Sequence, residues 1–122
     1  MQNTSELQAI GATTQDYFEG MYRRDMARLR KAFNPGALLI GHYQGALVQI
    51  PLDKWLAMVE SKPAPCDSGE AFDMRIVSVD VTAQVAVVKV VDLYFGLRYT
   101  DYLTMIKVDG QWRIVNKAFH HD

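Results

Sequence analysis

The sequence lacks the features that mark secreted, membrane-spanning and nucleic-acid-binding proteins. Its 122 residues include a single cysteine, Cys66, so no intrachain disulfide can form. Its 13 Lys and Arg residues against 14 Asp and Glu give a net charge of −1, which offers no electrostatic basis for binding nucleic acid or an anionic membrane. No apolar run approaches the roughly 20 residues of a membrane span. The beginning of the chain does not combine a basic segment with a continuous apolar one, as a signal peptide does. We therefore predict a soluble, cytoplasmic protein.

Motifs that hold phosphates or metals are also missing from the sequence. No glycine-rich phosphate-binding loop is present. The chain has three histidines whose positions do not follow a metal-ligand spacing: His42, His120 and His121. From the sequence we predict neither a metal nor a cofactor.

What is present is an apolar pattern that changes from a helical to a strand period along the chain. Spacings of three and four predict helices over residues 4–24, 26–33 and 52–60. Alternation and β-branched residues predict strands over residues 37–43, 46–50, 72–82 and 84–94, followed by a closing hairpin over residues 99–119. This order predicts one α+β domain over residues 1–122, with a curved antiparallel sheet wrapped around the long first helix. Such a sheet forms a cone with an internal cavity at its mouth.

The closing hairpin turns at Asp109-Gly110, a dipeptide that favours tight turns between strands. Apolar residues occur on both faces of the hairpin, so we expect helices to cover one face and a second sheet or subunit the other. The register across the hairpin has two possibilities. A three-residue loop places Asp101 opposite Lys117, whereas a two-residue loop places Tyr102 there. The sequence leaves both open.

Several short segments carry a resemblance to a known family. They are Tyr17 to Gly20, Asp25, Ala32-Phe33 with Pro35, Asp101 to Leu103, Lys107, and Trp112 to Lys117. In these residues the chain resembles the nuclear transport factor 2-like superfamily, and within it the lumazine-binding branch, which is related to polyketide-cyclase-like (SnoaL-like) and ketosteroid-isomerase-like proteins. The resemblance implies a cone-shaped α+β fold and a homodimer packed through the outer face of the sheet. It implies no single activity, because isomerases, dehydratases, cyclases and non-catalytic modules share this scaffold.

Two residues are candidates for acid–base catalysis. Asp101 could act as a general base if it faces a partly dehydrated cavity, and its structural alternative is an ion pair with Lys117. His42, in the first predicted strand, has an ordinary pKa near ~6.5 that suits proton transfer, and its alternative is a half-buried strand histidine. We favour the structural interpretation of both residues.

Three aromatic residues are candidates for ligand binding. Tyr17 could direct a hydroxyl into the cavity from the first helix, Trp55 could stack on a ligand, and Tyr94 shares a strand face with Asp92. Each of the three is also a common core residue.

Three functions from different classes fit the sequence. The first is a small-molecule-binding domain of unassigned activity that works as a homodimer, with a small hydrophobic or aromatic ligand. The second is a cofactor-independent lyase or isomerase that uses Asp101 or His42 as its base. The third is a non-catalytic dimerisation module. We favour the first, and the sequence leaves open whether the protein is an enzyme.

Overall fold

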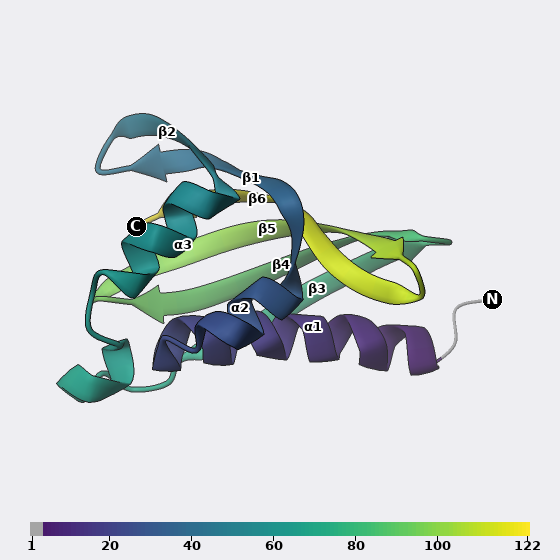
Figure 1. Ribbon diagram of the computed structural model, residues 1–122, viewed down its shortest axis with the longest axis horizontal. Helices are drawn as coiled ribbons and strands as arrows, with labels where there is room; N and C mark the ends of the chain where they lie inside the picture. Colours follow the sequence, from purple (N-terminus) through teal and green to yellow (C-terminus); the bar gives the residue numbers. More distant parts are fainter. Residues whose placement is uncertain (1–3) are drawn as a thin grey trace.

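The computed structural model describes residues 4–122, in which three α-helices lie on one side of a six-stranded sheet (Figure 1). The helices are α1 (Thr4–Arg23), α2 (Met26–Ala32) and α3 (Leu52–Glu60), and a short 3-10 helix, η1, spans Pro65–Ser68. The strands are β1 (Phe33–Tyr43), β2 (Ala46–Pro51), β3 (Met74–Thr82), β4 (Val85–Tyr94), β5 (Leu97–Val108) and β6 (Gln111–His121). No helix formed by residues 4–122 is long and apolar enough to cross a membrane.

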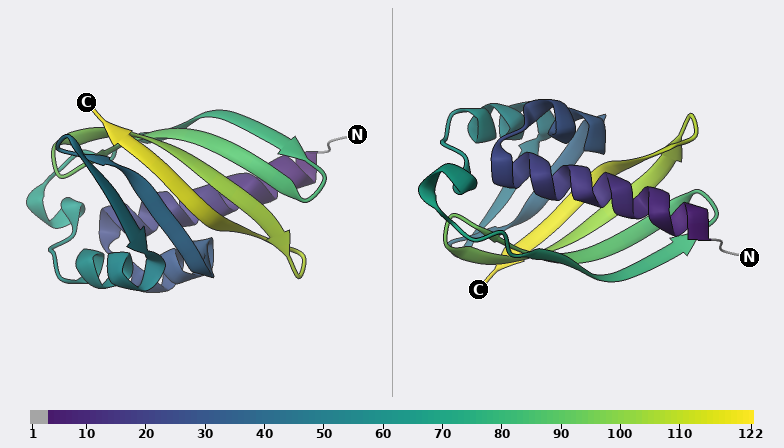
Figure 2. Two further views of the ribbon diagram at one scale, coloured as in Figure 1. Left: turned by 90° about the horizontal axis from the view of Figure 1, so that it is seen from above. Right: turned by 90° about the horizontal axis from the view of Figure 1, so that it is seen from below.

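The first two helices follow from local sequence signals. The apolar stripe of α1 buries Ile10, Tyr17 and Met21 against the sheet. The side chain of Asp25 then accepts a hydrogen bond from the backbone N–H of Arg28 at 3.2 Å, which caps the start of α2. Together the two helices cover the concave face of the sheet (Figure 2).

The strands are ordered β2-β1-β6-β5-β4-β3. Neighbours pair antiparallel except β1 and β6, which run parallel. The final strand therefore lies inside the sheet and joins the β1–β2 hairpin to the β3–β5 meander. Three of the tight turns have two residues with positive φ, namely Gln44-Gly45, Phe95-Gly96 and Asp109-Gly110. This conformation matches the twist of the adjoining strands.

Register shifts interrupt three of the strand pairings, including that of β1 with β6 between Phe33 and Leu38. In β3 the register shifts between Ile76 and Ser78. In β6 it shifts at Val115, because Met105 pairs with Ile114 whereas Thr104 pairs with Asn116. A bulge adds one unpaired residue, bends its strand and increases the local twist. The bend allows the sheet to wrap around α1 (Figure 2).

The concave face of the sheet forms the core. Residues of four strands are fully buried there: Leu39, Val88, Val90, Leu103, Met105 and Ile114. On the convex face, by contrast, Val85, Val87 and Tyr102 are exposed by 46%, 39% and 45%. The helices thus cover only one face of the sheet.

The predicted α+β fold, with a curved sheet wrapped around a long first helix, is confirmed. Its details differ in two places. The second helix ends at Ala32, and the following strand already begins at Phe33, because Pro35 disfavours a helical conformation of the residue before it. The parallel pairing of β1 with β6 was not expected from a sequence that predicted an antiparallel sheet.

Candidate functional site

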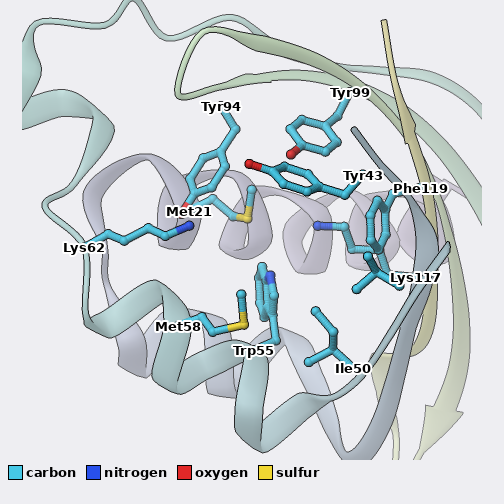
Figure 3. Close-up of a pocket in the computed structure, with 11 residues that line it drawn as sticks. Met21, Tyr43, Ile50, Trp55, Met58, Lys62, Tyr94, Tyr99, Lys117 and Phe119 are labelled. Atoms are coloured by element: carbon cyan, nitrogen blue, oxygen red, sulfur yellow. The ribbon is translucent and has the colours of Figure 1, made fainter. Parts of the chain in front are cut away.

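A cavity of about 290 Å³ opens at one end of the molecule, between the helices and the concave face of the sheet (Figure 3). Its walls are apolar and aromatic, with two lysines and three tyrosine hydroxyls as polar groups. The lining residues are Met21, Tyr43, Val48, Ile50, Trp55, Met58, Lys62, Tyr94, Tyr99, Lys117 and Phe119. Ligand pockets in proteins share this character, a concave apolar surface with a few polar groups that fix orientation.

Lys117 directs its amino group into the cavity (Figure 3). The side chain is 5% exposed, and its Nζ lies 4.8 Å from the ring centre of Trp55, 5.0 Å from Tyr17 and 5.6 Å from Phe119. Within residues 4–122, no carboxylate oxygen lies close enough to this amine, at 4.0 Å or less, to form an ion pair. The rings stabilise the ammonium through cation–π contacts but accept no conventional hydrogen bond from it.

The bulge at Val115 turns Lys117 inward. Ile114 faces the core, and regular alternation would place Lys117 on the opposite face of β6. The extra residue shifts the alternation by one, so that Lys117 pairs with Leu103 on the concave side. The position of this amine thus depends on one irregular residue.

Three tyrosine rings, those of Tyr43, Tyr94 and Tyr99, lie together on one side of the cavity (Figure 3). Burial, with a smaller effect of the Glu70 charge, raises the pKa of Tyr94 to about 12. Burial also raises the pKa of Tyr99. The Tyr94 and Tyr99 hydroxyls therefore stay neutral and can donate hydrogen bonds to a ligand.

A pair of buried carboxyl groups, Asp92 and Asp101, lies deeper on the same face of the sheet. Asp92 pairs with Tyr99 and Asp101 with Val90, so the two acids are diagonal neighbours on β4 and β5. The hydroxyl of Tyr17 donates a hydrogen bond of 2.7 Å to Asp101 Oδ2. Burial and the charge of Asp101 raise the pKa of Tyr17, which stays neutral as the donor.

The acid pair requires a proton. Among the described residues, neither oxygen of Asp92 nor Oδ1 of Asp101 has a hydrogen-bond donor. Burial, followed by the charge of Asp101, raises the pKa of Asp92 well above its usual range, and the charge of Lys117 opposes that rise. Two ionised carboxylates cannot hydrogen-bond each other, whereas a proton held at Asp92 can bridge to Asp101. Burial therefore favours the protonated form of Asp92, which can donate to Asp101.

The structure brings some of the predicted site residues together. Trp55 and Tyr94 line the cavity. Asp101 and Tyr17 are hydrogen-bonded to each other in the interior but do not line it. The expectation of an Asp101–Lys117 ion pair is wrong, because Asp101 is paired with Tyr17 instead.

His42 is not part of this site. It is exposed and alternates with Gly41 and Tyr43, the latter a lining residue, so it lies on the convex face of β1. Its ring lies 6.4 Å from that of His120 on the neighbouring strand β6. The structure therefore does not place His42, the second candidate base, at the cavity. Within residues 4–122, no cluster of three or more His, Cys, Asp or Glu could hold a metal ion.

Of the two predicted registers of the closing hairpin, the one with a two-residue loop is confirmed near the turn, but the partner predicted for Lys117 is wrong in both. The loop has two residues, which alone would place Tyr102 opposite Lys117, but the bulge moves Leu103 there. Sequence reasoning treated Lys117 only as a partner for Asp101 and did not consider Lys62, Tyr43 or Tyr99. Nothing in the β6 sequence marks Val115 as a bulge, so no local signal could have placed Lys117 in the cavity.

Residues 5–120 match the family described as putative lumazine-binding. The chain belongs to this family. A protein named Aldolase FrzH, from Cladobotryum sp., is 29% identical over 119 residues, which cover 96% of this chain and 92% of the relative.

The family's cone fold is also found in solved structures that resemble this chain. An NTF-2-like protein of unknown function from Silicibacter pomeroyi is 30% identical, with full coverage of both chains and a TM-score of 0.90. Another, from Shewanella baltica, is 24% identical, with a TM-score of 0.85 and coverage of 100% of this chain and 98% of that one. The family and its cone fold support a small-molecule-binding or isomerase-like domain.

Proposed function

We propose that this protein is a small-molecule-binding domain that takes an aromatic ligand into the cavity at the open end of its cone. The observation that carries the proposal is the cavity itself, about 290 Å³ in volume and lined by four tyrosine and tryptophan side chains together with Phe119. This volume is close to the lower end of ligand pockets, which begin at roughly 300 Å³. The lining supports stacking on a planar ligand, because the rings of Trp55 and Phe119 offer it flat apolar surfaces.

Thermal and chemical unfolding with a panel of mono- and bicyclic aromatic compounds tests the proposal. A compound present at 100 times its dissociation constant stabilises the folded state by about 2.7 kcal/mol. The variant Val48→Trp fills the cavity from β2 and should abolish the stabilisation. Leu47→Trp is the matched control, because Leu47 is its chain neighbour, is 67% exposed and does not line the cavity. Equal ligand-induced stabilisation in both variants would refute binding at this site.

We also propose that the protein acts as a homodimer through the convex face of its sheet. Val85, Val87 and Tyr102 are exposed there, and Ile106 pairs with Val85 across β4 and β5. Exposed apolar side chains on an otherwise mixed sheet face, with Asp80 and Lys89 beside them, suit a second copy of the same surface. Sedimentation should give a dimer at micromolar concentration and a folded monomer for Val87→Asp. A monomeric parent protein would contradict this part of the proposal.

A second candidate function is that of a cofactor-independent lyase acting on a carbonyl compound. It is favoured by the buried Asp92–Asp101 carboxyl pair deeper than the cavity on the same face of the sheet and by the similarity to a relative named as an aldolase. A base able to take the proton next to a carbonyl group would start such a reaction. Asp101 lies one inward-facing position deeper on β5 than the lining residue Tyr99, so the substrate would have to displace the Tyr99 ring to reach it.

Proton exchange of an aromatic ketone in D₂O, followed by NMR, tests this second function. Exchange above the buffer rate should be lost in Asp101→Asn and retained in Asp80→Asn, which changes an exposed acid on β3. Exchange that is no faster than in buffer, or that is unchanged in Asp101→Asn, would argue against a lyase. A dimer that binds no compound of the panel would instead favour the non-catalytic dimerisation module.

A further inference from the structure

The cavity has an unbalanced charge. Its lining holds two ammonium groups, Lys62 and Lys117, and none of its lining residues is an aspartate or glutamate. The acids nearest to Lys117 do not line the cavity and form no ion pair with it, although the charge of Lys117 opposes the rise of the Asp92 pKa. Asp101 accepts the Tyr17 hydrogen bond in the interior, and Glu70 accepts hydrogen bonds from the backbone N–H groups of Phe95 and Gly96 at 3.0 and 2.7 Å.

Lys117 is the more unusual of the two lysines. Its side chain is almost entirely buried, it points into the cavity, and it has neither an ion pair nor a hydrogen bond with any residue in 4–122. An ammonium group carries three N–H donors, and those of Lys117 face the cavity, where a ligand can accept from them. The surrounding rings compensate for the charge in part. A negatively charged ligand group would complete the site.

The other polar groups of the cavity are also donors or positively charged. The hydroxyls of Tyr94 and Tyr99 are protonated near pH 7, and burial raises their pKa values still further. The amine of Lys62 lies near the Tyr94 side of the cavity (Figure 3), on a loop whose carbonyl groups at Glu60 and Lys62 accept hydrogen bonds from Arg24. The lining thus offers hydrogen-bond donors at both ends and aromatic walls between them.

We infer that the ligand of this cavity is an aromatic carboxylate, whose negative group contacts Lys117 Nζ and whose ring system lies against Trp55 and Phe119. This inference rests on the proposed binding function and adds the chemical class of the ligand. It excludes aromatic cations, which would meet two like charges. It also ranks neutral aromatic compounds below acids of the same shape, because a neutral group brings no negative charge within ion-pair distance of the buried ammonium.

A pair of ligands that differ only in charge tests the inference. Isothermal titration with 2-naphthoate and with 2-naphthamide compares an anion with a neutral molecule of nearly the same size. The native protein should bind the carboxylate at least about tenfold more tightly, the range expected for one charge-assisted contact. Equal affinities for the two compounds would overturn the ligand class while leaving the binding function in place. If neither compound binds and the wider aromatic panel also fails, both proposals are wrong.

Substitution of Lys117 supplies the second test. Lys117→Met keeps an unbranched apolar stem and should remove the preference for the carboxylate, whereas Lys117→Arg should retain most of it. Lys89→Met is the control, since Lys89 lies on the convex face of β4 and should leave both affinities unchanged. A preference that persists in folded Lys117→Met overturns the role of Lys117. If Lys117→Met does not fold, the two ligands are compared in the native protein and in Lys117→Arg. A preference for the carboxylate that is absent from the native protein overturns the inference.

Discussion

The concave and convex faces of the sheet are built from similar residues but have different surroundings. On β4, Val88 is fully buried beneath the helices, whereas its neighbour Val87 is 39% exposed on the other side. The concave face also holds buried polar groups that the convex face lacks, namely the Asp92–Asp101 pair, Tyr17 and Lys117. A polar group in a dry interior must be matched or titrated, whereas a polar group on the surface is satisfied by water. We therefore expect substitutions on the concave face to change both the folding stability and the properties of the site. Substitutions on the convex face should change neither in a single chain.

The largest expected contrast comes from the two valines. Val88→Ala should lower the free energy of unfolding by about 2–3 kcal/mol, because it removes buried methyl groups and leaves a cavity. Val87→Ala should change it by less than about 0.5 kcal/mol. Urea denaturation at a concentration where the protein is monomeric measures both. Comparable losses in the two variants would mean that the convex face is already covered within a single chain.

A smaller effect is expected from the buried hydroxyl. Tyr17→Phe removes the donor to Asp101 and leaves a buried carboxylate oxygen unsatisfied, which should cost about 1–2 kcal/mol. Tyr22→Phe is the matched control, because the Tyr22 hydroxyl donates to the Glu70 carbonyl in a partly buried position. The control should lose less than Tyr17→Phe in the same urea measurement. The reverse order would mean that the interior pair does not depend on this donor.

The smallest effect is a change in the pH dependence of stability. The pKa of Asp92 is raised in the folded protein, so the folded state binds more protons than the unfolded chain between the ordinary and the raised pKa. Stability is therefore present at acidic pH and falls as the pH rises through this window, by at most about 1.4 kcal/mol per pH unit for one proton. Asp92→Asn should flatten this part of the curve.

A surface acid provides the opposite case. The hydrogen bond from Arg98 lowers the pKa of Asp73, so its contribution is present at neutral pH and is lost as the pH falls towards that lowered value. Asp73→Asn should therefore alter only the acidic end of the curve. If Asp92→Asn changes the curve only at the acidic end, as Asp73→Asn does, the pKa of Asp92 is not raised in the folded protein.

Much of the fold could be predicted from the sequence because its signals are local. The stripe of α1, the Asp25 cap and the Asp109-Gly110 turn act over a few residues, and all three are found in the structure. The site depended instead on non-local facts. Whether Lys117 faces the cavity is decided by one extra residue, Val115, and the partner of Asp101 is decided by the packing of α1, 84 positions away in the chain. Aromatic residues such as Trp55 could be proposed as ligand-binding residues from their residue type alone. Which of them line one cavity depends on how the helices pack on the sheet.

The position of β6 has a consequence for how the chain acquires its structure. The strand occupies the middle of the sheet although it is formed from residues 111–121, after every other element. Until it is available, the β1–β2 hairpin and the β3–β5 meander have no common partner, and each presents an unpaired edge. Contacts between β1 and β6 join residues about 80 positions apart, and such distant pairings slow folding because loop-closure entropy must be overcome first. We therefore expect chains still being synthesised to remain open to edge-to-edge association until their last strand emerges and closes the sheet.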